Sequence, residues 1–360
     1  MSTDSEQTGQ AGPAADVGRW FSTATAPARI DAPRSATASA PPSATASASP
    51  PAPVSASPPA PAPSSRPLMR MPAWGPVEGA SYGLTSAPEL VEEAWDLLTG
   101  EPTAVLTGAG MSTGSGLPDY RGRDAVPRAP MTFQEFMGSD LARRRYWARS
   151  TVGWTQFLRA RPNRGHVLLA ELGASTLPVT SVITQNVDAL HQQAGSEPVI
   201  DLHGRLDRVR CQSCDTLTRR ESLHHRMLAM NPELAARLPE LAADAAQAPD
   251  GDAEVDRTSD FRYPACGLCG GILKPDVVFF GESARREVVS AAYGALQEAS
   301  RLLVLGSSLT VQSGLRFVRA AVKAGTPVVI VNDGPTRGDD QATLRIHGRI
   351  EDVLETWNGS

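Results

Sequence analysis

Four cysteines, the only ones in this chain of 360 residues, form two Cys-x-x-Cys pairs, Cys211 with Cys214 and Cys266 with Cys269. Each pair can place two thiolates on one side of a tetrahedral ion, so two pairs complete a four-thiolate zinc site. Four ordinary buried cysteines would not require this paired spacing. A closed site leaves no position for water or substrate, which predicts a structural Zn²⁺, one per chain. Paired cysteines of this kind suit a reducing cytoplasm better than a disulfide framework does.

A second set of reactive side chains follows short apolar runs. Asn186 and Asp188 come after the run at 179–184, His203 comes after 199–202, and Asp119 lies beyond the run at 104–106. The carboxyl ends of parallel strands meet at one edge of a sheet, where ligands bind, so we expect a site there. A histidine suits general-base chemistry because its pKa lies near working pH. Taken singly, each of these residues is more typical of a cap or a polar surface group than of a functional site.

A glycine-rich segment follows the run at 104–106. Gly108, Gly110 and Gly114 form G-x-G-x-x-x-G, one residue longer than the usual dinucleotide fingerprint. Glycines allow backbone N–H groups to approach a phosphate closely, although a tight turn would need the same residues. Pro118-Asp119-Tyr120-Arg121 then adds an acid, an aromatic ring and a guanidinium directly after this loop.

The order of these motifs resembles that of the sirtuins, over about residues 80–355. The shared motifs are Gly108-Ala109-Gly110 with Ser112, Gly116-Leu117-Pro118-Asp119-Tyr120-Arg121, Gln185-Asn186-Val187-Asp188, Leu202-His203-Gly204, the two cysteine pairs and Gly306-Ser307-Ser308. The segments at 274–281 and 334–337 are similar to the class II branch, which includes mitochondrial deacylases and lipoamidases. Asp201 stands where that family commonly has Glu.

The resemblance implies an NAD-dependent protein-lysine deacylase. In that reaction the acyl oxygen attacks the nicotinamide ribose, nicotinamide leaves, and free lysine and O-acyl-ADP-ribose are formed. His203 would be the general base for a ribose hydroxyl, and Asn186 and Asp188 would line the nicotinamide pocket. The NAD-binding residues that the resemblance implies are Gly108, Ala109, Gly110, Ser112, Asp119, Tyr120, Arg121, Gln185, Asn186, Asp188, Gly306, Ser307, Ser308, Asn332, Asp333, Gly334 and Ile350.

The same resemblance implies where an acylated lysine of a protein substrate binds. The segment at 277–282 is similar to the one that pairs with substrate backbone, which assigns Val278, Phe279 and Gly281 to the peptide. Tyr146 and Arg149, three residues apart, share one face if their segment is helical. Some sirtuins use such a pair to bind a carboxylate on the acyl chain; a packed tyrosine and a solvated arginine is the alternative. We therefore expect better activity on acidic or long acyl groups than on acetyl.

Two other functions compete with deacylation. Mono-ADP-ribosyl transfer to protein would use the same NAD site, so the motifs do not separate the two. An NAD-sensing or scaffolding module would not need Asn186, Asp188 and His203 together.

Alternating strands and helices predict an α/β fold, a doubly wound (Rossmann-like) parallel sheet. We expect helices after a capping box at Ser86, over much of 125–160, after an Asn163 cap, near 221–246 and 314–324, and at 350–357. A smaller discontinuous domain, with a helical and a four-cysteine zinc-binding module, interrupts the sheet. The expected NAD-binding domain comprises 79–126, 165–208 and 275–360, and the smaller domain comprises 127–164 and 209–274.

Composition narrows the setting. The net charge of −5 offers no electrostatic case for nucleic acid, and the longest apolar runs are too short to span a membrane. Residues 1–78 are rich in Ala, Pro and Ser and are expected to be disordered, with the features of neither a signal nor a transit peptide. Lys274 and Lys323 are the only lysines, which suggests a GC-rich bacterial gene. We expect a cytoplasmic bacterial enzyme.

Overall fold

The structure, a computed structural model, describes residues 75–125, 130–244 and 258–360, all within one compact unit, Ser65–Ser360. The predicted tail up to residue 74 and the loop expected around Pro249 lie outside the described residues. Gly75, near the end of that predicted tail, donates its backbone N–H to the carbonyl of Tyr120 at 3.0 Å.

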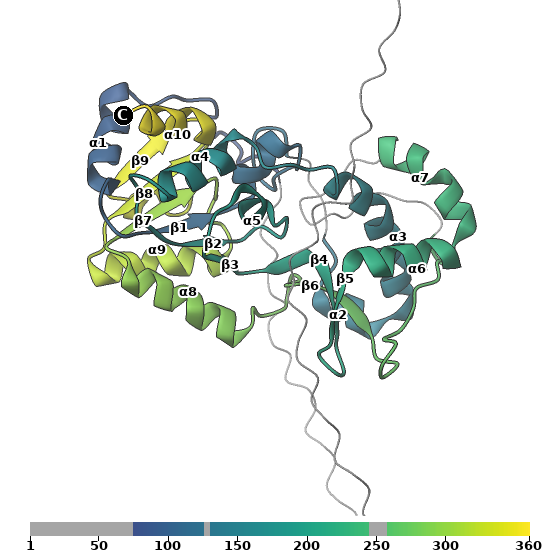
Figure 1. Ribbon diagram of the computed structural model, residues 1–360. Helices are drawn as coiled ribbons and strands as arrows, with labels where there is room; N and C mark the ends of the chain where they lie inside the picture. Colours follow the sequence, from purple (N-terminus) through teal and green to yellow (C-terminus); the bar gives the residue numbers. More distant parts are fainter. Residues whose placement is uncertain (1–74, 126–129, 245–257) are drawn as a thin grey trace, which may run out of the picture. The chain divides into compact units, whose positions relative to one another are not determined.

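The larger of two sheets has six strands, all parallel, in the order β3-β2-β1-β7-β8-β9 (Figure 1). Its strands are β1 (Thr103–Thr107), β2 (Val179–Thr184), β3 (Val199–Asp201), β7 (Arg301–Leu305), β8 (Val328–Asn332) and β9 (Leu344–His347). This confirms the doubly wound parallel sheet. The order of strand addition reverses between β1 and β7, which makes their carboxyl ends the expected place for a ligand.

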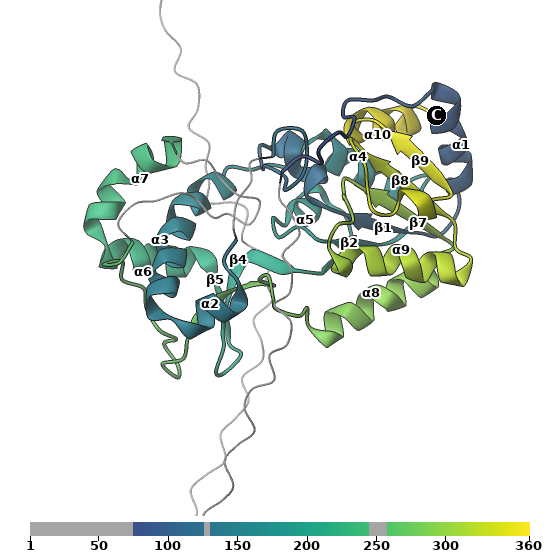
Figure 2. The ribbon, with the colours of Figure 1, turned by 180° about the vertical axis from the view of Figure 1, so that it is seen from behind.

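Helices cover both faces of this sheet. On one face lie α1 (Pro88–Leu98), α4 (Arg164–Gly173) and α10 (Ile350–Asn358), and on the other lie α8 (Arg286–Glu298) and α9 (Gln312–Ala324) (Figures 1 and 2). The alternation of strand side chains explains the two layers. Val105 packs in a cluster with Leu172 and Trp357, whereas its neighbour Leu106 packs with Leu296 and Phe317. Apolar runs without polar interruptions are therefore buried on both sides.

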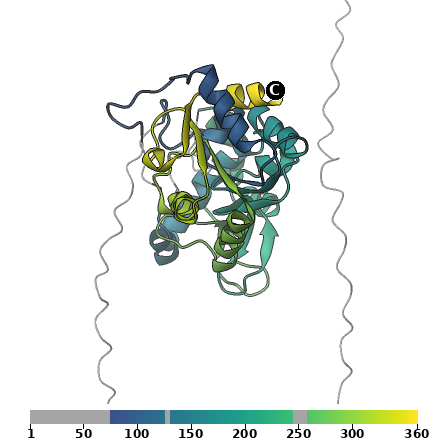
Figure 3. The same ribbon diagram turned by 90° about the vertical axis from the view of Figure 1, so that its left-hand side faces the viewer.

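The first and last helices pack together, as the end-on view in Figure 3 shows. Trp95 of α1 and Trp357 of α10 stack with ring centroids 5.8 Å apart, and the Trp357 indole donates to the Val91 carbonyl at 3.0 Å. The capping box predicted at Ser86 is wrong. The α1 N-cap is Ala87, and the Ser86 hydroxyl instead accepts the backbone N–H of His347 at the end of β9, at 2.8 Å.

Most of the other described elements form the helical and cysteine-bearing part. Its three-stranded antiparallel sheet has the order β5-β4-β6 and contains β4 (Gly204–Cys211), β5 (Leu217–Arg219) and β6 (Leu273–Val277). The helices are α2 (Phe133–Gly138), α3 (Asp140–Phe157), α6 (Arg220–Met230) and α7 (Pro232–Asp244). The helical predictions for 125–160 and 221–246 are confirmed in the parts that are described. Aromatic residues of α2 and α3 pack against β4 and β6 as one hydrophobic core.

Three short elements complete the fold: η1 (Ala109–Ser115), α5 (Leu190–Ala194) and η2 (Asp339–Gln341). The Asn163 cap is confirmed, because its side chain accepts the backbone N–H of His166 at 3.1 Å. Among the described helices, none has both the length and the apolar character needed to cross a membrane.

Candidate active site

Two loops meet at the point where the sheet reverses. Gly108 follows β1, Gly306 follows β7, and the Gly110 N–H donates to the Gly306 carbonyl at 2.9 Å. A Cβ added at Gly108 would lie 2.8 Å from that carbonyl oxygen, and one at Gly110 would lie 2.9 Å from it. These glycines thus allow two backbones to touch. The sequence predicted that these glycines let backbone N–H groups approach a phosphate. In the structure, the group that lies close to them is the backbone of Gly306, in the loop after β7.

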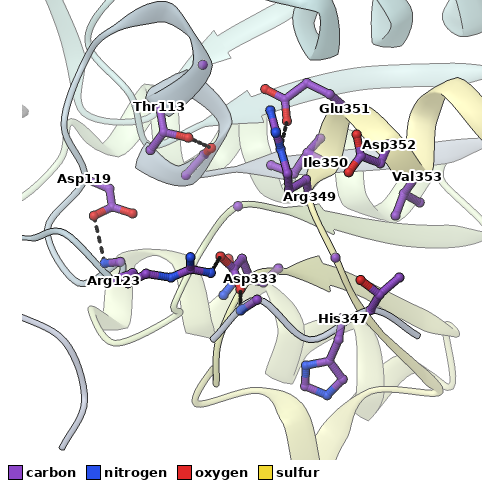
Figure 4. Close-up of a pocket in the computed structure, with 18 of the residues that line it drawn as sticks. Thr113, Asp119, Arg123, Asp333, His347, Arg349, Ile350, Glu351, Asp352 and Val353 are labelled. Carbon is purple, nitrogen blue, oxygen red and sulfur yellow. Dashed lines mark hydrogen bonds and ion pairs between the residues drawn. The ribbon is translucent and has the colours of Figure 1, made fainter. Parts of the chain in front are cut away.

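A cavity of about 940 Å³ opens beside these loops, within the size range of cofactor sites (Figure 4). The predicted cofactor-binding residues that line it are Gly110, Asp119, Gly306, Asn332, Asp333 and Ile350. Arg123, Arg349 and Glu351, which were not predicted, also line it. Arg123 lies 3.5 Å from the Asp333 carboxylate, and Asp333 also accepts the Gly83 N–H at 2.5 Å. The wall of the cavity therefore carries both positively and negatively charged side chains.

Asp119 organises the turn at the mouth of this cavity. Its carboxylate accepts the Gly122 N–H at 2.7 Å, and a Cβ at Gly122 would lie 2.1 Å from one of its oxygens. Burial raises the pKa of Asp119, and backbone hydrogen bonds from Gly122 and Arg121 oppose that rise. Burial also lowers the pKa of Arg121. The next residue in the predicted motif, Tyr120, packs edge-on against Phe280, with centroids 6.4 Å apart.

Three predicted residues form a buried polar cluster. The Ser112 hydroxyl donates to the Asp188 carboxylate at 2.6 Å, and the Asn186 amide donates to Ser112 Oγ and to the Gly108 carbonyl, both at 3.0 Å. The Leu190 N–H donates to the other Asp188 oxygen at 2.9 Å. Burial raises the pKa of Asp188, and the bonds from Ser112 and Leu190 oppose this. Since Ser112 uses its proton for Asp188, the carboxylate acts as an acceptor.

Residues that sequence reasoning missed support this cluster. The Thr107 hydroxyl donates to Thr184 Oγ1 at 2.8 Å, and Thr184 accepts the backbone N–H of Asn186 at 3.1 Å. His191 Nε2 lies 3.0 Å from Thr107 Oγ1, and burial lowers the His191 pKa to about 3, which keeps the ring neutral. His191 is therefore a buried, structural residue that packs against the end of β1.

His203 is held with one nitrogen ready to accept a proton. Its Nδ1 lies 2.8 Å from the Gln185 carbonyl, which can only accept, so Nδ1 carries the hydrogen. Its Nε2 lies 2.9 Å from the Ser313 hydroxyl, which therefore donates to it. Burial lowers the His203 pKa to about 4, so the ring is a neutral base. His203 bonds to the backbone carbonyl of Gln185, and the side-chain oxygen of Gln185 accepts from the Ser307 hydroxyl at 2.7 Å. Gln185 therefore connects His203 to the loop after β7.

The other predicted NAD-binding residues occupy the same loops. Ala109 begins η1, Ser308 accepts a hydrogen bond from Thr310 at 3.1 Å, and the Gly334 carbonyl accepts the Asn332 amide at 2.9 Å. The cavity lining includes neither His203 nor the Ser112–Asn186–Asp188 cluster. His203 and this cluster therefore form a polar inner region that the wall of the outer cavity does not include.

The predicted substrate residues lie on α3 and on the segment after β6. Tyr146 is buried and packs against Phe279, with centroids 5.1 Å apart, and Arg149 is half-buried one turn further along α3. The Gly281 carbonyl accepts the Gln134 amide at 3.1 Å. The Val278 N–H donates to the His203 carbonyl at 2.8 Å, so this group links the segment to His203 and is not open to a substrate strand.

The four cysteines converge as predicted. One Sγ atom from each lies within 4.8 Å of the others, with Cys211 and Cys269 3.5 Å apart and Cys214 and Cys266 3.8 Å apart. Tetrahedral Zn–S bonds of about 2.3 Å require sulfur atoms about 3.8 Å apart, so these residues fit a structural zinc ion.

The sheet, the paired loops and the cysteine cluster define a class, α/β proteins with a doubly wound sheet and a zinc module. Comparison with known proteins identifies the family. The Sir2 family model matches residues 108–313, and the chain belongs to that family, whose members use NAD.

Relatives and solved structures agree with this assignment. The chain is 50% identical over 274 residues to "NAD-dependent protein deacetylase 1" of Mycobacterium avium (strain 104), covering 76% of this chain and 95% of the relative. It is 52% identical over 265 residues to "NAD-dependent protein deacetylase 1" of Streptomyces coelicolor, and this match covers 72% of this chain and 86% of the relative. A solved structure described as "Sir2-p53 peptide-NAD+" is 31% identical in sequence, with a TM-score of 0.56. The match covers 74% of this chain and 96% of the chain in that structure.

Proposed function

We propose that this protein is an NAD-dependent protein-lysine deacylase that uses His203 as its general base. The observation that carries the proposal is the pair of hydrogen-bond partners of that ring, from which its tautomer follows. Nδ1–H is committed to the Gln185 carbonyl, and the Nε2 lone pair faces a hydroxyl 2.9 Å away. A neutral imidazole held in one tautomer, with its lone pair aimed at a hydroxyl, is the state in which a histidine removes a proton from an alcohol.

The residues around His203 suggest how NAD would be held. Bound NAD would supply an electrophilic ribose carbon and nicotinamide as the leaving group. The cavity of about 940 Å³, with Asp119, Asp333 and Ile350 on its wall, would hold the outer part of the dinucleotide. In the buried inner region Asp188 would accept a hydrogen bond from the nicotinamide amide, and Asn186 and Ser112 would fix that carboxylate.

We infer that a ribose hydroxyl takes the place of the Ser313 hydroxyl at His203 Nε2 during turnover. The ribose hydroxyl would donate to Nε2, as the Ser313 hydroxyl does at 2.9 Å. It would pass its proton to that nitrogen as its oxygen attacks the acyl carbon of the substrate. The Gln185 carbonyl would stabilise the resulting imidazolium through Nδ1–H, at 2.8 Å. Ser313 would then be a residue that holds the base in its resting orientation.

The protein substrate would be an acylated lysine. Two of the similar solved structures are described as "Sir2-p53 peptide-NAD+" and "Sir2 bound to acetylated peptide". Tyr146 and Phe279, whose ring centroids are 5.1 Å apart, would form an apolar wall for the acyl chain. Arg149 would bind a carboxylate at the end of that chain. We assign the chain to the class II branch on its 274–281 segment, and we infer that it acts in a bacterial cytoplasm.

Product analysis by mass spectrometry tests this proposal. The purified protein would be incubated with NAD and peptides carrying acetyl, succinyl, glutaryl or lipoyl lysine. Free lysine peptide together with O-acyl-ADP-ribose is the expected result. Protein or peptide that carries ADP-ribose, without O-acyl-ADP-ribose, would identify an ADP-ribosyltransferase instead. NAD binding without either product would identify a binding module.

A further inference from the structure

The helix pair α3 and α6 contains a buried cation for which the described residues supply no counter-charge. Arg220, the first residue of α6, has 0% of its surface exposed. Its Nη2 donates to the Ser150 carbonyl at 3.1 Å and to the Ser150 hydroxyl at 3.3 Å. No carboxylate of the described residues acts on its charge; the groups that do are the Tyr146 phenol, the rings of Trp147 and Trp154 and the His224 imidazole. Burial lowers the Arg220 pKa to about 10, so the group is still charged at neutral pH.

The groups around Arg220 share a second property: their buried polar nitrogens have no hydrogen-bond partner among the described residues. The guanidinium lies 5.2 Å from the ring centroids of both Trp147 and Trp154. Within the described part of the chain, both indole N–H groups and the Arg220 Nε and Nη1 atoms are buried without a hydrogen-bond partner. His224 Nδ1, on the next turn of α6, is also buried without one. A buried polar nitrogen without a partner is destabilising, so this grouping needs a physical cause.

The chemistry of these groups restricts what can satisfy them. Guanidinium and indole nitrogens only donate, so their partner must accept several hydrogen bonds. Water would bring two hydrogens of its own that need acceptors, and the two Ser150 oxygens beside Arg220 already accept from its Nη2. A single unpaired guanidinium calls for a single negative charge. The near-complete burial of Arg220, Trp147 and Trp154 calls for a compact one.

We propose that Arg220, Trp147 and Trp154 form a buried binding site for a compact monoanion, a halide or a carboxylate, between α3 and α6. The anion would accept from Arg220 Nε and Nη1 and from one or both indoles. It would offset the charge of a guanidinium that no described side chain neutralises. This site is separate from the Ser112–Asn186–Asp188 cluster and from His203, and it does not depend on the proposed reaction.

Thermal unfolding at constant ionic strength tests the site. Wild-type protein would be compared in sodium bromide, in sodium acetate and in the sodium salt of a bulky sulfonate buffer. Bromide probes the halide source and acetate the carboxylate source. A bound anion should raise Tm by about 2–4 °C over the sulfonate. In Arg220→Met this difference should disappear, whereas Arg144→Met, which removes an exposed guanidinium paired to Asp140 on α3, should keep it. Equal Tm in all three salts, or the same difference in Arg220→Met, would overturn the proposal.

Crystals of the wild-type protein grown in bromide provide a readout that does not depend on the variant's folding. An anomalous bromide peak within about 3.5 Å of the Arg220 guanidinium is expected. Density there for a carboxylate of the protein's own chain, or for water alone, would contradict the proposal.

Discussion

Lys274 holds the segment that joins His203 to the predicted substrate site, and its removal has a calculable effect. Its ammonium donates to the Val277 carbonyl, to the Pro275 carbonyl at 3.2 Å and to the Glu282 carboxylate at 3.0 Å. The Lys274 side chain is 5% exposed and that of Glu282 is 21% exposed. Glu282 also accepts the Phe279 N–H at 2.8 Å, so one ion pair closes the turn.

Lys274→Met keeps most of the apolar part of the side chain and removes the ammonium, with its charge and its three hydrogen bonds. Breaking a fully buried ion pair costs about 3–5 kcal/mol. Because Glu282 is about one-fifth exposed, water recovers part of that loss, and we expect about 2–3 kcal/mol in the free energy of unfolding. The turn would loosen where the Val278 N–H holds the His203 carbonyl at 2.8 Å. The KM for an acyl-peptide should therefore rise several-fold, while the Kd for NAD stays within twofold.

Urea unfolding and steady-state kinetics on an acyl-peptide provide the two measurements. Arg285→Met is the matched control, because Arg285 pairs with Asp215 at 2.7 Å with side chains 46% and 66% exposed. That surface pair should contribute less than about 1 kcal/mol. A Lys274→Met protein as stable as the control variant, or one with an unchanged peptide KM, would refute this reasoning.

Three further outcomes follow from the site. Cys211→Ser should lose zinc and cooperative folding together, as measured by metal analysis and thermal unfolding; full metal content in a stable variant would exclude the four-thiolate site. His166 and His191 have pKa values lowered by burial to about 4 and about 3, so the unfolded chain binds more protons and stability should fall as pH drops below about 6.5. Each histidine should contribute about 1.4 kcal/mol per pH unit to the pH dependence of the free energy of unfolding. When this free energy is measured by urea unfolding between pH 6.5 and 4, it should fall less steeply with pH in His191→Gln than in wild type; an equally steep fall would contradict this. Arg149→Met should reduce turnover of succinyl and glutaryl peptides much more than of acetyl peptides; an equal loss would mean that Arg149 supports the fold.

The larger sheet could be predicted because its strands leave little choice. Runs such as 302–305 and 328–331 are apolar at every position, and only a strand covered on both faces buries all of them. The antiparallel sheet could not be predicted in this way. Arg208 and Arg210 lie within β4, so that strand has no continuous apolar run, and its pairing with β6 joins residues far apart in the sequence.

The site divides along similar lines. Ser112, Asn186 and Asp188 could be predicted to meet because each follows a strand that ends at one edge. Ser313 and Thr107 could not, since a single hydroxyl residue in an ordinary context carries no signal until the fold sets its partner. Val278 was expected to contact a substrate strand, which stays a prediction, and only the tertiary structure reveals that its N–H bonds to the His203 carbonyl. The division into an NAD-binding and a smaller domain at the boundaries given above stays a prediction.

The role of His203 as base is the central claim, and one comparison tests it most directly. Wild-type protein and His203→Ala would be measured for NAD binding by calorimetry and for free-lysine formation from an acyl-peptide by mass spectrometry. Ser313→Ala is the control, because it removes the resting partner of Nε2 at 2.9 Å and leaves the base in place. We predict that His203→Ala binds NAD within a few-fold of wild type and forms free lysine at least about 10²-fold more slowly, with Ser313→Ala close to wild type. Undiminished free-lysine formation by His203→Ala would contradict the account.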